Sequence, residues 1–197
     1  TGADTDPADG IFYEDFYYCK KNKSIWDAAR NMGAPVNTNR HESVCCISAD
    51  GQEVYFFKCL GDKKSDDVVC GDIYTAKLSG NIWSNPEMLP NINTAYWESH
   101  PTISADGNSL YFASDRPEGF GGRDIFVSHK NTETGDWQEA ENLDSSINTP
   151  YDDAFPFIHP DGKTLYFSSK GHPGIGGYDI FVSQLQANGK WSKPQNI

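Results

Sequence analysis

Three acidic residues recur at equivalent places in this sequence and could act together: Glu42, Glu98 and Asp153. Each precedes a segment with the composition of a β-strand. If those strands lie side by side around an axis, their carboxylates would form a ring at one mouth of a channel. Such a ring could hold a cation or attract a basic partner. The alternative is that the three residues are separate charges on solvated loops.

A second acidic set opens short apolar runs, at Asp15, Asp72, Asp124 and Asp179. These carboxylates could be ligand groups, but a catalytic or ligating residue is needed once, whereas these recur throughout the chain. A structural role explains the recurrence better. Each carboxylate would then accept backbone N–H groups in the loop that precedes the apolar strand.

The five cysteines all lie in the first 70 residues, at positions 19, 45, 46, 59 and 70. Cys59 and Cys70 bracket one loop between adjacent strands, so a disulfide between them is geometrically reasonable. By restraining the unfolded chain, such a crosslink would contribute roughly 2–4 kcal/mol. The alternative is a pair of reduced, partly buried thiols. Cys19, Cys45 and Cys46 receive no assignment.

Catalytic chemistry finds little support in the sequence. His100 and His159 could face a channel, but no nucleophile with an orienting partner accompanies them. The segments Gly-Phe-Gly-Gly at 119–122 and Gly-Ile-Gly-Gly at 174–177 are followed by strands, whereas a phosphate loop needs a helix behind its glycines. There is no Cys-x-x-Cys motif and no histidine pair at helical spacing. We therefore expect no enzyme activity, no catalytic, cofactor-binding or metal-binding residues, and no cofactor.

Charge and composition narrow the possible partners. The 197 residues include 16 Lys and Arg against 28 Asp and Glu, which gives a net charge of −12. That charge disfavours binding to nucleic acid or anionic lipid. No apolar run approaches the roughly 18 residues needed to span a bilayer, so direct membrane insertion is not expected. With Thr at position 1 and no leader, the chain has the character of a soluble, trimmed segment of a longer protein.

A repeat of about 55 residues organises the whole sequence. One marker is tryptophan, at Trp26, Trp83, Trp137 and Trp191. A second is Asp-Gly followed by an apolar triplet, and a third is the aspartate that opens an apolar run. Within the best repeat we predict an inner strand from about Pro101, a tight Asp-Gly turn, strands over 109–114 and 124–129, and a fourth strand that carries Trp137. The tryptophans are expected to fill gaps between neighbouring sheets.

Two of the predicted strands are apolar on both faces, although no segment has the length and period of a covering helix. The sheets must therefore cover one another. Radial packing of four-stranded antiparallel sheets achieves this, so we predict an all-β protein, part of a β-propeller with about three and a half blades of a larger ring. A solenoid or β-helix is the alternative. The chain is treated as one domain, 1–197, with a half blade at 1–40 and blades at about 41–97, 98–152 and 153–197.

The phrases Ser-Ala-Asp-Gly-Asn-Ser-Leu-Tyr-Phe-Ala-Ser-Asp-Arg at 104–116 and Gly-Gly-Arg-Asp-Ile-Phe-Val-Ser at 121–128 resemble the WD40-like propeller repeat of TolB-type proteins. They are most similar to its long-period form in OmpA-family envelope proteins of Bacteroidota. The resemblance spans about 11–197 and is strongest in the last two repeats. It implies a periplasmic, outer-membrane-associated propeller that contacts other envelope proteins, in an assembly such as the type IX secretion system. Peptidoglycan would be bound only by domains outside this chain.

Three functions are consistent with these patterns. The first is a non-enzymatic scaffold for protein–protein interaction in the cell envelope, because propeller faces are broad surfaces built from loops on a rigid support. The second is the gating propeller of a prolyl-oligopeptidase-type peptidase. The third is carbohydrate binding by aromatic residues near the loops, namely Tyr96, Trp97, Phe120 and Tyr151.

Overall fold

The computed structural model describes residues 10, 12–58 and 71–197, and this part of the chain consists of strands and turns. None of the described residues belongs to a helix long and apolar enough to cross a lipid bilayer. The predicted disulfide between Cys59 and Cys70 lies outside the described residues.

Three antiparallel sheets follow one another along the chain. The first sheet contains β5 (Glu42–Ile47), β6 (Glu53–Lys58), β7 (Asp72–Ser79) and β8 (Ile82–Trp83), with β9 (Glu87–Met88) also paired to β7. The second contains β10 (Glu98–Ile103), β11 (Ser109–Ser114), β12 (Asp124–His129) and β13 (Glu141–Asn142). The third contains β14 (Asp153–Ile158), β15 (Thr164–Ser169), β16 (Asp179–Gln184) and β17 (Gln195–Asn196).

The strand predictions for the second sheet are confirmed at its centre and wrong at its edges. Strands β11 and β12 have the predicted bounds, 109–114 and 124–129. The inner strand begins at Glu98 rather than near Pro101, because Glu98 and Ser99 also pair with β11, ahead of a register shift between Ser99 and Thr102. Trp137 makes only an isolated bridge with Lys130, and the fourth strand is formed by the two residues of β13.

Tight turns join the first two strands of each sheet, as the Asp-Gly pairs predict. The glycines at 51, 107 and 162 have φ of 71°, 73° and 67°. Glycine adopts this left-handed conformation without the steric cost that a Cβ atom brings. The preceding aspartate also holds the turn, since the carboxylate of Asp106 accepts hydrogen bonds from Ser104 Oγ at 2.5 Å and Asn108 N at 3.1 Å.

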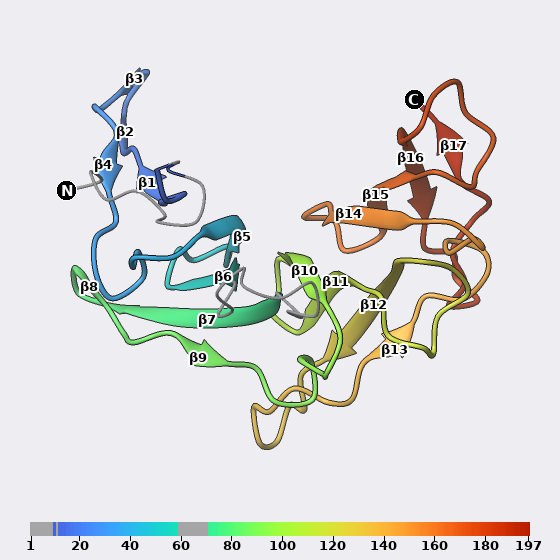
Figure 1. The fold of residues 1–197 in the computed structure, drawn as a ribbon, viewed down its shortest axis with the longest axis horizontal. Coiled ribbons are helices and arrows are strands. Elements are labelled where there is room, and N and C mark those ends of the chain that lie inside the picture. Colours follow the sequence, from blue (N-terminus) through green and yellow to red (C-terminus); the bar gives the residue numbers. More distant parts are fainter. Residues whose placement is uncertain (1–9, 11, 59–70) are drawn as a thin grey trace.

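The three sheets form an open arc (Figure 1), with β5, β10 and β14 on its concave side and the last strands of each sheet on its convex side. Strand β10 contacts both β5 and β14, so the first strands of the three sheets are neighbours. Sequential four-stranded antiparallel sheets arranged radially in this way define a β-propeller architecture.

The core lies between the sheets. One cluster joins Tyr55 and Ile73 of the first sheet to Leu110, Phe112 and other residues of the second. Another cluster joins the second sheet to the third through residues that include Tyr111, Ile125, Val127, Leu165, Phe167, Phe181 and Trp191. Each sheet therefore supplies the apolar cover that its neighbour needs, which explains how strands with two apolar faces are stable without helices.

Before the first sheet the chain forms two short strand pairs. β1 (Tyr17–Tyr18) pairs with β4 (Arg30–Asn31), and β2 (Lys21–Asn22) pairs with β3 (Ile25–Trp26). In Figure 1 these pairs stand at the N-terminal end of the arc. They form two separate two-stranded sheets in the part of the chain that the structure describes.

The four tryptophans do not share one environment. Trp137 and Trp191 are 7% and 9% exposed and pack edge-on against Tyr55 and Tyr111 of the preceding sheet. Trp83 is partly buried against the cluster around Phe56. Trp26 is 61% exposed, so the prediction that it fills a gap between sheets is wrong. Its repeat has no preceding sheet among the described residues, and Lys21 Nζ, 5.4 Å from the ring centroid, lies over it instead.

This difference predicts unequal mutational costs. Trp137→Ala should lower the free energy of unfolding by about 3–5 kcal/mol, because it opens a cavity between two sheets. Trp26→Ala should change it by less than about 0.5 kcal/mol, since the ring is largely in solvent. Chemical denaturation of both variants measures the difference. Equal losses would contradict the inter-sheet packing of Trp137.

Candidate functional site

The connectors between sheets carry a short motif, Val-Asn-Thr at 36–38 and Ile-Asn-Thr at 92–94 and 147–149. The aliphatic residue is fully buried in each case. In the connectors at 92–94 and 147–149, the asparagine then pairs with the third strand of the sheet before it. Asn148 Oδ1 accepts from Ile125 N at 2.8 Å, while its Nδ2 donates to Ile125 O at 2.9 Å. Asn93 makes the same pair of bonds with Ile73, and Asn37 with Phe16.

The threonine of the same motif binds the acidic residue that opens the next sheet. Thr94 donates from N and Oγ1 to the Glu98 carboxylate at 2.9 and 2.7 Å. Thr149 donates to Asp153 at 2.6 and 2.8 Å, and Thr38 makes the corresponding bonds to Glu42. Neighbouring residues of one connector thus hold two successive sheets. The sequence shows this motif as a regular connector, but its hydrogen bonds depend on tertiary contacts.

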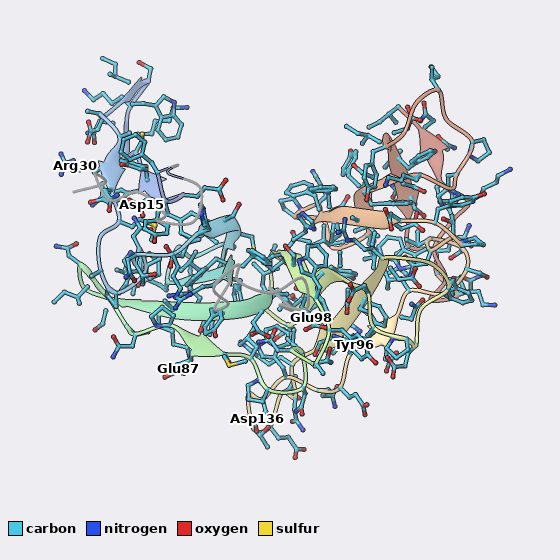
Figure 2. All side chains as sticks on the ribbon, viewed as in Figure 1. Asp15, Arg30, Glu87, Tyr96, Glu98 and Asp136 are labelled. Carbon is cyan, nitrogen blue, oxygen red and sulfur yellow. The ribbon has the colours of Figure 1, made fainter. Side chains whose placement is uncertain are left out.

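The carboxylates of Glu42, Glu98 and Asp153 are therefore buried, with exposures of 1%, 0% and 0%. The prediction of an acidic ring at a channel mouth is wrong for this arrangement, and so is the alternative of solvated loop charges. The physical reason is that each carboxylate turns back onto the connector, where backbone and hydroxyl donors replace water. Figure 2 labels Glu98, which is fully buried, near Tyr96, which is 44% exposed.

The unfavourable burial of this carboxylate is compensated differently in each sheet. Lys58 Nζ lies 3.2 Å from Glu42, and the nearly buried Arg116 guanidinium lies 3.1 Å from Glu98. Arg116 also donates to Ile92 O at 2.7 Å and lies over the Phe126 ring at 4.7 Å. A buried ion pair of this kind is stable only when its remaining donors and acceptors are also satisfied.

Asp153 has no Lys or Arg partner among the described residues, and its Oδ1 has no hydrogen-bond partner there. Burial raises the pKa of Asp153 above its usual value, although Ser169 and the bonds from Thr149 oppose the shift. Where the second sheet has Arg116, the third has His172, whose Nε2 donates to Ile147 O at 2.8 Å. The imidazole thus replaces the guanidinium at the connector carbonyl and against the neighbouring phenylalanine rings.

These differences predict opposite responses to neutralising the acid. Glu98→Gln should lower the free energy of unfolding by about 3–5 kcal/mol, because Arg116 would remain buried without a counter-ion. Asp153→Asn keeps the acceptor for Thr149 and removes an ionisation that burial opposes. At pH 7 the stability of this variant should therefore equal or exceed that of the wild type, as urea denaturation would measure. A comparable loss in both variants would contradict the assignment.

Of the four aspartates that open apolar runs, Asp72, Asp124 and Asp179 are the first residues of their strands, and Asp15 lies just before β1. Asp179 accepts from Ile175 N at 2.8 Å and Gly176 N at 3.0 Å, and Asp124 accepts from the N–H groups of Phe120 and Gly121. Asp15 accepts from Asn31 Nδ2 at 2.7 Å. For Asp72, burial and then the nearby charge of Glu98 raise the pKa.

The glycine-rich loop at 119–122 packs tightly against the next connector. A Cβ atom at Gly121 would lie 2.1 Å from Tyr151 O and 2.4 Å from Thr149 O. A side chain there would therefore displace backbone, and Gly122 N donates to the same Tyr151 O at 3.3 Å.

The remaining residues singled out in the sequence are not brought together into a site. Cys19 is exposed, and His159 Nδ1 lies 3.1 Å from the Asp161 carboxylate of its own turn. In the described part of the chain, no group of three or more His, Cys, Asp or Glu could hold a metal ion.

An apolar groove of about 530 Å³ runs along the first strands of the three sheets. Its walls come from β5, β10 and β14 and from the turns that follow them, and include His100, Pro101, Ile103, Pro156, Ile158 and Pro160. Three large apolar side chains on this groove are exposed to solvent, Ile47 by 56%, Phe155 by 49% and Phe157 by 53%. We call this surface the inner-strand groove.

Phe155, His100 and Trp97 make successive ring contacts beside the inner-strand groove. His100 packs against Phe155 with ring centroids 3.9 Å apart and against Trp97 at 5.4 Å. The Arg123 guanidinium lies over Trp97 at 4.5 Å. Of the four aromatic residues considered for carbohydrate stacking, Trp97 is thus already covered by Arg123. Tyr96, Phe120 and Tyr151 are 44%, 52% and 62% exposed.

Burial, and secondarily the charge of Arg123, lowers the pKa of His100 to about 4. The folded protein therefore keeps this imidazole neutral below pH 6.5, where the unfolded chain takes up a proton. A lowered histidine pKa contributes stability that is complete above pH 6.5 and is lost as the pH falls toward 4.

His100→Asn should accordingly flatten the decline in stability between pH 6.5 and 4, by roughly 3 kcal/mol at most. Asparagine suits the positive φ of 55° at this position and does not titrate. Urea denaturation at several pH values measures the effect, and His159→Asn on an exposed turn is the control. If both variants followed the wild-type pH profile, His100 would not be a neutral buried group.

Comparison with solved structures agrees with the radial architecture. TolB from Acinetobacter baumannii is similar with a TM-score of 0.53 and 16% identity, over 85% of this chain and 34% of that protein. A TolB protein from Agrobacterium tumefaciens, described as putative, gives 0.52 and 17%, over 95% and 69%. The tricorn protease gives 0.54 and 12%, over 86% and 19%. No protein-family model matches this sequence, and no curated protein is similar to it.

At these low sequence identities, the structural similarity establishes the fold but not a family or a function. The chain is all-β, with the antiparallel four-stranded blades of a β-propeller. More particularly, it is similar to the propellers of TolB-type proteins. Because it spans about a third of the length of the first TolB, 34%, the activity and partners of a whole protein are a matter for proposal.

Proposed function

We propose that this propeller is a non-enzymatic docking scaffold that binds another protein through the inner-strand groove. The observation that carries the proposal is the exposure of Ile47, Phe155 and Phe157 together on one apolar groove. Apolar side chains gathered in a concave surface are typical of interaction sites, whereas scattered ones are ordinary. The groove is lined mainly by carbon atoms of proline, isoleucine and phenylalanine, which favours an apolar ligand segment over a polar substrate.

The chemistry of the partner follows from the groove and the net charge. An extended segment with two or three large apolar side chains would fit a groove of about 530 Å³ along three neighbouring strands. The chain as a whole carries a charge of −12, so basic residues on the partner would accelerate association.

The cellular setting is proposed from the repeat resemblance, with the TolB-like fold in support. We place the propeller in the periplasm, associated with the outer membrane, as part of an OmpA-like assembly such as the type IX secretion system. Its partners there would be other envelope proteins, and peptidoglycan would be bound by separate domains. Nucleic acid and lipid are disfavoured as ligands by the negative charge.

A second candidate is the gating propeller of a prolyl-oligopeptidase-type peptidase. The similarity of the tricorn protease and of a puromycin-hydrolysing peptidase from Mycobacterium tuberculosis, with TM-scores of 0.54 and 0.50, makes this role structurally reasonable. A hydrolase domain with a Gly-x-Ser-x-Gly motif elsewhere in the native protein would favour it.

The scaffold proposal predicts the effect of making the groove polar. A photo-crosslinking amino acid at Phe157 should capture one envelope protein, and the affinity of that purified partner should fall at least tenfold in Phe155→Ser/Ile47→Ser. Ile175→Ser is the matched control, because Ile175 is 97% exposed and lies outside the groove. The isolated chain should not be retained on purified peptidoglycan sacculi. Unchanged partner affinity in the double variant would exclude the groove, and retention on sacculi would contradict the separate peptidoglycan-binding domain.

A further inference from the structure

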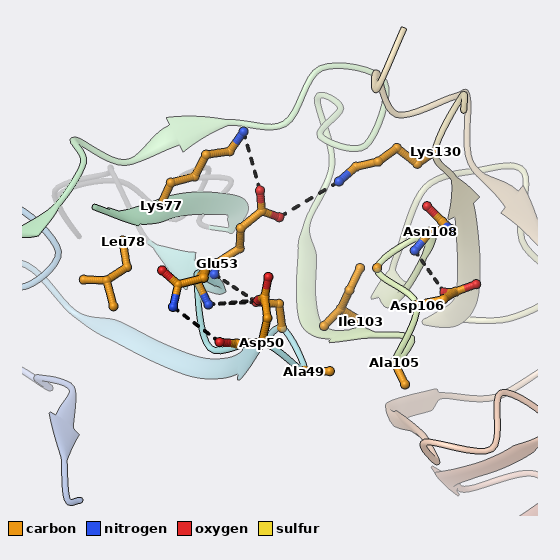
Figure 3. Close-up of a pocket in the computed structure, with 13 residues that line it drawn as sticks. Ala49, Asp50, Glu53, Lys77, Leu78, Ile103, Ala105, Asp106, Asn108 and Lys130 are labelled. Atoms are coloured by element: carbon orange, nitrogen blue, oxygen red, sulfur yellow. Dashed lines mark hydrogen bonds and ion pairs between the residues drawn. The ribbon is translucent and has the colours of Figure 1, made fainter. Parts of the chain in front are cut away.

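A second groove lies between the first and second sheets. Figure 3 shows its wider part, of about 560 Å³, where the Asp50 and Asp106 turns face each other and Glu53 lies between Lys77 and Lys130. The same three charged residues also line a deeper part of about 330 Å³. The walls of the deeper part include Tyr55, Thr75, Asn91 and Trp137. Among the described residues, this deeper part shares none with the inner-strand groove.

The tyrosine–tryptophan pair in this second groove, which we call its aromatic frame, recurs between the second and third sheets. Tyr55 meets Trp137 edge-on with centroids 6.2 Å apart, and Tyr111 meets Trp191 in the same way at 6.4 Å. The two contacts are equivalent, because both tyrosines lie on the second strand of their sheet and both tryptophans come from the following sheet. The frame is therefore part of how neighbouring sheets pack.

The polar residues on that frame do not repeat. Glu53 pairs with Lys77 across β6 and β7, and the equivalent pair across β11 and β12 is Ser109 with His129. Tyr55 pairs with Thr75, whereas Tyr111 pairs with Val127. Lys130 bridges Trp137, whereas Leu185 bridges Trp191. Residues needed to build a blade would recur, so this single occurrence points to a binding role at one inter-sheet groove.

Thr75 supplies independent support. It is 8% exposed, and its Oγ1 has no hydrogen-bond partner in the part of the chain that the structure describes. Valine has the same shape and occupies the equivalent positions 127 and 182. Packing therefore does not require the hydroxyl. A buried hydroxyl without a partner is unfavourable, and a ligand in the groove would satisfy it.

The charged groups in the groove are arranged as alternating donors and acceptors. The Glu53 carboxylate accepts from Tyr55 OH at 2.6 Å, and it lies 3.5 Å from Lys77 Nζ and 3.9 Å from Lys130 Nζ. The two lysine contacts are too long for good hydrogen bonds, so their donors can turn to a ligand. Lys130 Nζ also lies 4.9 Å over the Trp137 ring, which holds it beside the cavity.

We propose that this groove binds a neutral polyhydroxylated ligand, such as one or two units of a sugar. Hydroxyl groups both donate and accept, which matches a carboxylate, two ammonium groups and a free threonine hydroxyl. An anion would meet an excess of acidic lining residues, namely Asp50, Glu53, Glu87, Asp106 and Asp136. Cation binding is disfavoured because Lys77 and Lys130 already lie beside the Glu53 carboxylate. A volume of about 330 Å³ is within the range of small-molecule sites.

Titration calorimetry and saturation-transfer NMR with glucose, N-acetylglucosamine, maltose and cellobiose, together with a glycan array, test the proposal. At least one sugar should bind the wild-type chain. Thr75→Val and Lys77→Gln, which install the residues found in other repeats, should each weaken that binding at least tenfold while circular dichroism stays unchanged. Lys163→Gln, an exposed lysine on another turn, should bind as the wild type does.

Three outcomes would overturn the proposal: no sugar binds, the Thr75→Val chain binds as tightly as the wild type, or inorganic phosphate binds in place of every sugar. The test is separate from the scaffold proposal, because Phe155→Ser/Ile47→Ser alters the inner-strand groove and should leave sugar binding unchanged. Loss of partner capture with intact sugar binding, or the reverse, therefore distinguishes the two sites.

Discussion

The asparagine in each connector is the contact on which the propeller depends. Asn37, Asn93 and Asn148 each use the side-chain oxygen and nitrogen to bind the backbone N–H and C=O of one earlier residue. For Asn93 and Asn148 that residue lies on the third strand of the preceding sheet, and for Asn37 it is Phe16, just before β1. The residue that follows each asparagine, a threonine, binds the carboxylate that opens the following sheet. These bonds set the distance and angle between successive sheets. Only at that spacing can apolar strands with two buried faces cover one another without helices.

The first strand of each sheet begins with a buried carboxylate, and its charge is compensated differently in the three sheets. Glu42 and Glu98 are compensated by Lys58 and Arg116, whereas Asp153 relies on its threonine bonds and has a raised pKa. The backbone geometry is conserved across the three blades even though the counter-charge is not. The hydrogen bonds of the connector therefore determine the geometry, and the ion pairs adjust its stability.

Where the repeats differ, they indicate where this propeller acts on other molecules. The inner-strand groove exposes phenylalanine and isoleucine on β5 and β14, while the groove between the first two sheets adds charges and a hydroxyl to a frame that recurs elsewhere. The common frame is explained by packing. The departures from it are not, and they are therefore the better guide to binding in a fold whose blades are otherwise alike.

The sequence by itself determined the repeat, the Asp-Gly turns, the central strands at 109–114 and 124–129, and hence the propeller, because period, turn chemistry and apolar patterning are local properties. It did not determine that Trp26 is exposed or that Glu98 is buried. It also gave no sign of the Asn93 pairing, although the Ile-Asn-Thr motif was visible. Glu98 and Arg116 are 18 residues apart, and Asn93 reaches back 20 residues to Ile73. Tertiary structure decided these features, because burial and hydrogen bonding depend on which distant segments the fold brings together.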